Sequence, residues 1–246
     1  TRTLTLATVD AGERPAVLSA IAKAYCTDAM RTIVNDAMDI RAGAAIMRGP
    51  RNILERIYAT IPIGITVEGA NILTRSMIIY GQGAIRCHPY VLEEMEAIAT
   101  ADVGRFDRAF FGHLGLVARN AVRAPLLALS SGLRERTMPS RGVARRFRRR
   151  LGRSSAAFAL VSDAALATLG GRLKRREKIT GRLADALAWL YIGSATVKRF
   201  QDAGEPESER AFVVWACETA LAEVDRALSG VLRNLPTRWM AYLLAP

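Results

Sequence analysis

Glu68 is the only carboxylate in a long apolar segment, which reads Ile61-Pro-Ile-Gly-Ile-Thr-Val-Glu-Gly-Ala-Asn-Ile-Leu-Thr-Arg75. Burial among apolar side chains raises the pKa of a carboxyl towards the working range of a general base. We therefore expect Glu68 to be buried and to abstract a proton. A plainer role is also open, because a carboxylate at a helix N-terminus can simply complement the helix dipole.

The segments before Glu68 predict helices that would position it. Residues 1–14 are polar and indicate either a loop or the remnant of an element whose beginning is missing, and Pro15 suits the first turn of a helix. Apolar residues then recur every three or four positions for about 25 residues, up to the stretch Ala42-Gly-Ala-Ala-Ile-Met-Arg-Gly-Pro50. A short second helix is expected over 51–59, and Pro62 should break the chain after it.

A further helix is predicted to start near Glu68 and to run towards Tyr80, with Thr66 as its N-cap. Its apolar residues cover most of its circumference, so it should lie in the middle of a bundle. The turn Gly81-Gln-Gly83 should end it.

The remaining sequence also has helical periodicity. Helices are expected over 90–101, 104–124, 154–169, 177–201 and 206–232, with Pro125 as a kink or break and turns at 170–171 and 203–206. We therefore predict an all-α chain of two helical bundles that join around residues 82–90.

Charge and cysteine spacing limit the kinds of ligand and metal site that this chain can have. The formal net charge is +12, and the whole excess lies in residues 134–182, where fifteen basic residues face three acidic ones. Such a field attracts nucleic acid, anionic lipid or phosphate-bearing ligands.

Cys26, Cys87 and Cys217 lack metal-ligand spacing, which argues against disulfides and zinc, and we expect each to be buried. No apolar run reaches the roughly 20 residues of a membrane span, so none is expected.

Several motifs give this chain a family resemblance. They are Asn35-Asp-Ala-Met-Asp-Ile40, Tyr80-Gly-Gln-Gly-Ala-Ile-Arg-Cys-His-Pro89, the Gly-Gly-Arg-Leu-Lys-Arg-Arg-Glu-Lys run at 170–178, and Leu232-Arg-Asn-Leu-Pro236. With Glu68 and its neighbours, they resemble the C-terminal part of bacterial long-form, flavin-dependent acyl-CoA dehydrogenases. The resemblance implies a helical bundle of the acyl-CoA dehydrogenase C-terminal type over 1–85 and a bacterial-type accessory helical domain over 86–246. It also implies that the chain is truncated and, without its upstream domains, inactive alone.

The resemblance implies fatty acyl-CoA dehydrogenation in β-oxidation. Glu68 would remove the α-proton of the acyl thioester while the β-hydrogen leaves as hydride to FAD, giving a trans-2-enoyl-CoA. The backbone N–H of Glu68 would help to polarise the thioester carbonyl, and Gly69 would let the acyl chain approach the backbone. Gly43 and Asn71 are the implied cofactor-binding residues.

One departure from the family pattern concerns the flavin. Relatives carry Gly-Gly-x-Gly where this chain keeps only Gly43 and has Ala42 and Ala45 at the other two positions. If these positions need positive φ or close approach, each alanine costs about 1 kcal/mol or more and weakens flavin binding. The alternative is therefore a non-catalytic helical module that associates with anionic membrane or protein partners.

The resemblance also implies partners. These are the acyl-CoA substrate and an electron-transferring flavoprotein, and a homo-oligomer is compatible with the resemblance. The implied location is the cytoplasm or the periphery of the inner membrane. The run from Arg145 to Arg153 has Val143, Phe147 and Leu151 at four-residue intervals, which predicts a basic amphipathic helix. It is either a solvated surface or a dock for anionic membrane. Nucleic-acid binding is not expected, because no recognition motif or stacking aromatic platform accompanies the arginines.

Two histidines complete the candidates. His88 precedes Pro89 and is expected to be a turn or capping residue, and His113 lies among apolar residues of a predicted helix. Neither has a metal partner at suitable spacing, so no metal site is predicted.

Overall fold

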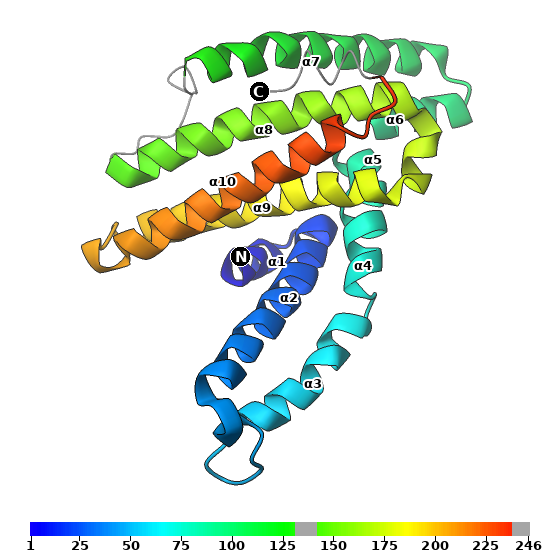
Figure 1. Cartoon of the computed structure of the whole chain (residues 1–246). Helices are drawn as coiled ribbons and strands as arrows, with labels where there is room; N and C mark the ends of the chain where they lie inside the picture. Colours follow the sequence, from blue (N-terminus) through cyan, green and yellow to red (C-terminus); the bar gives the residue numbers. More distant parts are fainter. Residues whose placement is uncertain (131–141, 238–246) are drawn as a thin grey trace. The chain divides into compact units, whose positions relative to one another are not determined.

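The computed structural model describes residues 1–130 and 142–237 of the chain (Figure 1). The chain divides into two compact units: a first unit, Arg2–Ile79, and a second unit that comprises Tyr80–Pro246 and Thr1. Within the described ranges the regular structure is helical, apart from an isolated bridge between Gly49 and Asn52. The predicted all-α fold is confirmed.

The first unit is built around α2, which packs against α1, α3 and α4. The elements are α1 (Arg2–Asp10), α2 (Ala16–Arg41), the 3-10 turn η1 (Ala42–Ala45), α3 (Leu54–Thr66), α4 (Asn71–Leu73) and most of the π-helical segment η2 (Thr74–Gln82). The long helix predicted after Pro15 is confirmed, and it ends at Arg41 as expected. Residues 2–10 are helical, so of the two alternatives left open there the structure has a regular element and not a loop.

Two boundary predictions around Glu68 are also wrong. Pro62 lies inside α3, and Thr66 ends α3, where its Oγ1 donates to the Pro62 carbonyl at 2.7 Å. The next helix begins at Asn71, and its N-cap Ala70 offers no side-chain cap. Ile61, the residue before the proline, is only 2% exposed, and its packing helps α3 to continue through the missing N–H of Pro62.

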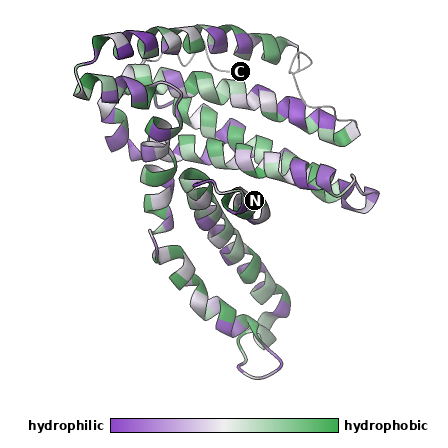
Figure 2. Cartoon of the chain, turned by 180° about the vertical axis from the view of Figure 1, so that it is seen from behind, coloured by the Kyte–Doolittle hydropathy of each residue, from purple (hydrophilic) through white to green (hydrophobic). Residues whose placement is uncertain are grey.

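The segment after Asn71 does not end at the predicted Gly81-Gln-Gly83 turn. The π-helical η2 runs to Gln82, and α5 (Gly83–Cys87) follows directly. Ile79 is fully buried, but Ile72 is 74% exposed and Met77 41% exposed, so the expected position in the middle of a bundle is not met within this chain. Figure 2 shows green, apolar residues along α3 and α4.

The second unit is a layered helical bundle. Helix α8 packs against α7, α9 and α10, and α9 and α10 pack along each other. Phe147, Leu183, Val197 and Val224 are at most 1% exposed and form its centre. The elements are α6 (Val91–Ala99), α7 (Val103–Leu129), α8 (Gly142–Leu169), the 3-10 helix η3 (Gly170–Arg175), α9 (Glu177–Asp202), the 3-10 turn η4 (Glu207–Glu209) and α10 (Arg210–Leu232).

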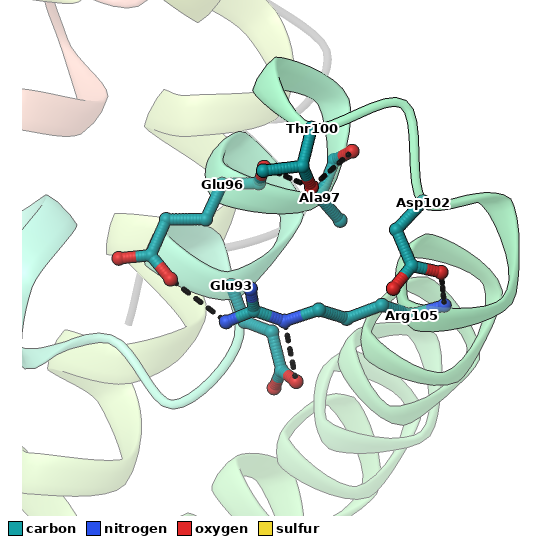
Figure 3. Close-up of polar contacts among 6 residues, drawn as sticks. All are labelled: Glu93, Glu96, Ala97, Thr100, Asp102 and Arg105. Atoms are coloured by element: carbon teal, nitrogen blue, oxygen red, sulfur yellow. Dashed lines mark hydrogen bonds and ion pairs between the residues drawn. The ribbon is translucent and has the colours of Figure 1, made fainter.

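The α6–α7 turn is fixed by polar contacts (Figure 3). The Asp102 side chain accepts a hydrogen bond from the Arg105 N–H at 2.9 Å and so caps the start of α7. The Arg105 guanidinium reaches back to α6, where it contacts Glu96 at 2.7 Å and Glu93 at 3.4 Å. These contacts hold the two helices as a hairpin.

Helix α8 is longer than predicted and includes the arginine-rich run. By length and composition, the continuous helical stretch Gly142–Arg175 could cross a membrane. Within it, 39% of an apolar 18-residue segment is buried inside the structure. Its packing against α7, α9 and α10 is also that of a core helix. Cys26 and Cys87 are exposed, contrary to expectation, whereas Cys217 is buried as predicted.

Candidate functional site

Glu68 lies in a strained loop, residues 67–70, which connects α3 to α4. Its φ is 54°, in the left-handed region that few residues other than glycine adopt, and Gly69 follows with φ 87°. Strain of this kind costs about 1–3 kcal/mol and persists only where surrounding contacts enforce it. Such strain concentrates at functional sites, which makes this loop a candidate site.

The contacts that enforce the loop come from Lys23 on α2. Its Nζ donates to the carbonyl of Gly69 and to Oδ1 of Asn71, both at 2.7 Å, and lies 3.3 Å from the Ile65 carbonyl. Thr74 Oγ1 donates to the same Gly69 carbonyl at 3.2 Å. One ammonium group therefore ties both ends of the Glu68 loop to α2.

Asn71 forms the buried end of this network and is 6% exposed. Its Nδ2 contacts the Ala24 carbonyl at 3.1 Å, and Thr27 Oγ1 and Asp28 Oδ1 at 2.8 Å each. The amide is thus used within the unit, so a cofactor contact from Asn71 would have to come from its backbone. Its side chain positions the Glu68 loop.

The Glu68 side chain itself is exposed in this chain, so the expected burial by its neighbours is not met. Val67 beside it is 47% exposed, and the apolar residues of the segment do not close over the carboxylate. Among the described residues none accepts a hydrogen bond from the Glu68 N–H, which leaves this donor available. Gly69 is required locally, because a Cβ there would lie 3.2 Å from Thr74 Oγ1 at a positive φ.

A second feature of the first unit is an open cavity of about 640 Å³ at the end of α2. Ala42 and Ala45, the two positions where glycine was expected, both line it. Ala42 has φ 48°, so this position does take the positive φ for which glycine is suited. Gly43 has no atom within 4 Å of where a Cβ would lie. The remaining lining residues are Asn35, Met38, Asp39, Ile46 and Tyr58.

Two family matches cover almost the whole chain. Residues 3–81 match the acyl-CoA dehydrogenase C-terminal domain, and residues 85–246 match the bacterial-type C-terminal region of acyl-CoA dehydrogenase. The chain belongs to the acyl-CoA dehydrogenase family. The resemblance inferred from the sequence motifs is thereby confirmed.

The fold of this acyl-CoA dehydrogenase chain is similar to that of a solved family member. The crystal structure of an acyl-CoA dehydrogenase complexed with FAD from Bacillus anthracis matches with a TM-score of 0.67 at 17% identity. The match covers 93% of this chain but 35% of that protein, so the chain spans about a third of the solved relative. At this identity the likeness shows a shared fold.

The arginine-rich start of α8 is helical, but its apolar side is not free. Phe147 is fully buried and Leu151 is 5% exposed, both inside the second unit. Arg146 and Arg150 both bind Glu218 on α10, and the Arg150 hydrogen bond holds the pKa of the Glu218 carboxyl below its usual range. An apolar face inserted into a membrane is therefore ruled out for this helix as folded, and only its exposed cations can attract an anionic surface.

Sequence spacing missed one polar cluster in the second unit, because its members lie far apart along the chain. Candidate ligand atoms of His88, His113 and Asp163 all lie within 4.8 Å of one another. His113 Nδ1 is 2.8 Å from Glu94 Oε1, and His88 Nε2 is 3.6 Å from Asp163 Oδ1.

The His88 ring explains the cluster without a metal. Its Nδ1 accepts the N–H groups of Tyr90 and Val91 at 3.2 Å each, which confirms the predicted capping role at the start of α6. If Nδ1 accepts these bonds, the ring proton is on Nε2, which lies 3.6 Å from Asp163 Oδ1 and has no hydrogen-bond partner among the described residues. A metal ion would need the lone pair that this proton occupies, so we interpret the cluster as structural.

Proposed function

We propose that this chain supplies the base and part of the flavin cradle of an FAD-dependent fatty acyl-CoA dehydrogenase, which forms trans-2-enoyl-CoA in β-oxidation. The observation that carries the proposal is the strained Glu68 loop, which Lys23 holds onto α2 through the Gly69 carbonyl and Asn71. Positive φ alone is not specific, since Glu205 in the turn after α9 also has it, and the anchoring by Lys23 is what distinguishes the Glu68 loop.

Glu68 is the proposed base. Its carboxylate would take the proton from the α-carbon of the acyl thioester, and its free N–H would donate to the thioester carbonyl, where negative charge develops. Gly69 is the proposed point where the acyl chain passes the backbone. Exposure of Glu68 in this chain means that water must be excluded by substrate and by further protein, since a solvated carboxylate is a weak base.

The residues at the end of α2 fit the nucleotide side of a flavin in part. The cavity of about 640 Å³ is large enough for part of a cofactor, and the open space at Gly43 allows close backbone approach. Its lining side chains include the carboxylate of Asp39, which suits a sugar hydroxyl better than a phosphate. When bound, FAD supplies the acceptor for the hydride that leaves the β-carbon.

The remaining assignments are proposals of the same kind. Residues 1–85 would form the acyl-CoA dehydrogenase bundle and residues 86–246 the accessory domain. An electron-transferring flavoprotein would take up the electrons, acting in the cytoplasm or at the inner membrane. A membrane contact would be electrostatic, because the apolar residues Phe147 and Leu151 are buried.

The test is Glu68→Gln in a polypeptide extended upstream to the length of the solved relative. Loss of a general base should lower kcat about 10²- to 10⁴-fold while flavin stays bound. The matched control is Glu13→Gln, another exposed carboxylate of the first unit, which should leave turnover unchanged. Near-normal turnover of the Glu68→Gln protein would remove Glu68 from the mechanism.

The second candidate function is a non-catalytic module that has kept the fold. Ala42 favours it, because an alanine at φ 48° weakens a segment proposed to hold flavin. The visible absorption spectrum of the same extended polypeptide separates the two. An oxidised-flavin spectrum that bleaches with a long-chain acyl-CoA supports the enzyme, and a folded protein that stays colourless with added FAD supports the module.

A further inference from the structure

We propose that the second unit holds a separate binding site for a single-chain amphiphile that has an apolar tail and an anionic head. The site is a partly enclosed cavity of about 360 Å³ formed by η2, α5, α6, α8, η3 and α9. Its lining residues are Tyr80, Gly81, Ile85, Val91, Met95, Leu166, Gly170, Gly171, Leu173, Lys174 and Thr180.

The walls of the cavity are suited to an apolar tail. Ile85, Val91, Leu166 and Leu173 come from four different elements and converge on it, and each is buried or half-buried by the surrounding helices. Its volume lies within the range of about 300–1,000 Å³ that small-molecule sites occupy. An apolar cavity of this size gains free energy when a hydrocarbon chain enters it and leaves water.

At the first two residues of η3 the cavity wall carries no side chain. Gly170 and Gly171 line the cavity, both are exposed, and neither has an atom within 4 Å of where a Cβ would lie. Met95, 48% exposed, lies on the cavity wall as well. A chain can therefore enter past the two glycines without displacing backbone.

The charge around this entrance selects the head group. Lys174 is the only charged side chain among the lining residues. It belongs to a run of five exposed cations: Arg172, Lys174, Arg175, Arg176 and Lys178. None of them belongs to an ion pair among the described residues, and the one carboxylate in the run is Glu177. Unpaired cations beside an apolar cavity are complementary to a carboxylate or phosphate on a hydrocarbon chain.

This site lies wholly in the second unit, whereas Glu68 and the cavity at Ala42 lie in the first. The inference therefore does not depend on the proposed dehydrogenation. Its test needs neither flavin nor turnover.

The experiment is fluorescence titration of the full chain with cis-parinaric acid, a polyene fatty acid that becomes fluorescent in apolar sites. We expect saturable binding to one site per chain. Gly171→Leu should weaken it, because Gly171 lines the cavity and a leucine adds bulk at that wall, while the backbone conformation of Gly171 tolerates a Cβ. The matched control is Gly115→Leu on α7, an exposed glycine with equally open surroundings, which should bind like the wild type.

A second pair of variants tests the head group. Lys174→Gln should weaken binding up to about fivefold, the scale of one partly exposed charge contact, while Lys178→Gln outside the cavity should have a smaller effect. The methyl ester of a fatty acid should compete worse than the free acid. Equal competition by acid and ester would overturn the anionic head, and unchanged binding by the Gly171→Leu protein would overturn the site.

A third arm separates a soluble ligand from a membrane lipid. Palmitate and palmitoyl-CoA should each displace cis-parinaric acid from the chain in the absence of vesicles. Flotation with vesicles of phosphatidylglycerol should be the same for wild-type and Gly171→Leu proteins. Vesicle binding that is lost in the Gly171→Leu protein, without displacement by the soluble amphiphiles, would overturn the proposal in favour of membrane docking at η3.

Discussion

At the scale of single residues, Glu68 and Ala42 both hold a left-handed backbone in the first unit. The motif around Glu68 and the replacement of glycine at Ala42 and Ala45 could be identified from residue types alone. The φ values of Glu68 and Ala42 could not, because backbone torsions there are set by distant contacts such as the one from Lys23 to the Gly69 carbonyl. The exposure of Glu68 was not predicted, because the apolar residues around it in the sequence do not show which parts of the fold cover the carboxylate.

Ala42→Gly should stabilise the chain by about 1 kcal/mol. Relief of strain at φ 48° outweighs the entropy that glycine adds to the unfolded state. The midpoint of urea unfolding measures the gain. Ala44→Gly is the matched control: it lies exposed in the same turn without a positive φ, and glycine there should give no gain. Equal shifts for both variants would contradict strain at Ala42.

Cys217 should resist alkylation while Cys26 and Cys87 react. Burial raises the pKa of the Cys217 thiol to about 11, so almost no thiolate exists near neutral pH, whereas the other two thiols are exposed. Mass spectrometry after iodoacetamide treatment should show two adducts on the native chain and three on the unfolded chain. Three adducts on the native chain would contradict the burial.

The Cys217 thiol should also make the free energy of unfolding depend on pH. Because the folded thiol has the higher pKa, the unfolded chain loses this proton first as pH rises above about 9. The contribution of Cys217 to stability is therefore complete below pH 9 and falls as pH approaches 11. Cys217→Ala should reduce the alkaline loss of the free energy of unfolding.

At the scale of elements, periodicity predicted the helices and failed at their ends. The helices α2, α6 and α9 begin and end within about two residues of their predicted bounds. The prediction failed where a local signal opposed tertiary packing: Pro62 sits within α3, and Thr66 belongs to its last turn. A proline or a capping residue shifts the balance by a few kcal/mol, which the burial of Ile61 against the unit can outweigh.

Asn71→Ala should destabilise the first unit by about 1–3 kcal/mol. The change leaves the Lys23 ammonium and the Ala24 carbonyl without their buried amide partner. Thermal unfolding measures the loss, and limited proteolysis should show faster cleavage in the 67–70 loop. The control Asn234→Ala removes an exposed amide bonded only to the Gly230 carbonyl and should change stability by less than about 0.5 kcal/mol.

His88→Ala should fray the start of α6. It removes the acceptor for the N–H groups of Tyr90 and Val91, at a cost of about 1 kcal/mol. Amide hydrogen exchange at Tyr90 and Val91 should accelerate. Unchanged exchange at both positions would show that the ring does not cap the helix.

At the scale of the whole molecule, the two units of this acyl-CoA dehydrogenase chain differ in how completely they bury their apolar residues. The second unit has a continuous core in which Phe147, Leu183 and Val224 are fully buried. Both units expose some large apolar residues, such as Ile40 at 84% and Leu129 at 86%, but few are buried in the first unit: Ile21, Ala24, Val34, Ala45, Ile61 and Ile79. Sequence predicted two helical bundles but not this contrast, because the pattern of apolar residues along a helix is the same whether or not another protein surface covers them.

Separate fragments should show the same contrast. A fragment of residues 80–246 should unfold cooperatively, because its core lies within one set of packed helices. A fragment of residues 1–79 should be only partly helical or should associate, because its apolar faces have too little cover. Circular dichroism and sedimentation measure both. A monomeric, cooperatively folded 1–79 fragment would contradict this account.

The left-handed backbone at Glu68 also sets two selection pressures against each other. Glycine or asparagine at this position would relieve the strain, so a library randomised at residue 68 and selected only for folded protein should enrich those two residues. If Glu68 is the base of the proposed dehydrogenase, the same library in the extended polypeptide, selected for dehydrogenation, should retain glutamate. The gap between the two outcomes would measure how much stability the chain gives up for chemistry at one position.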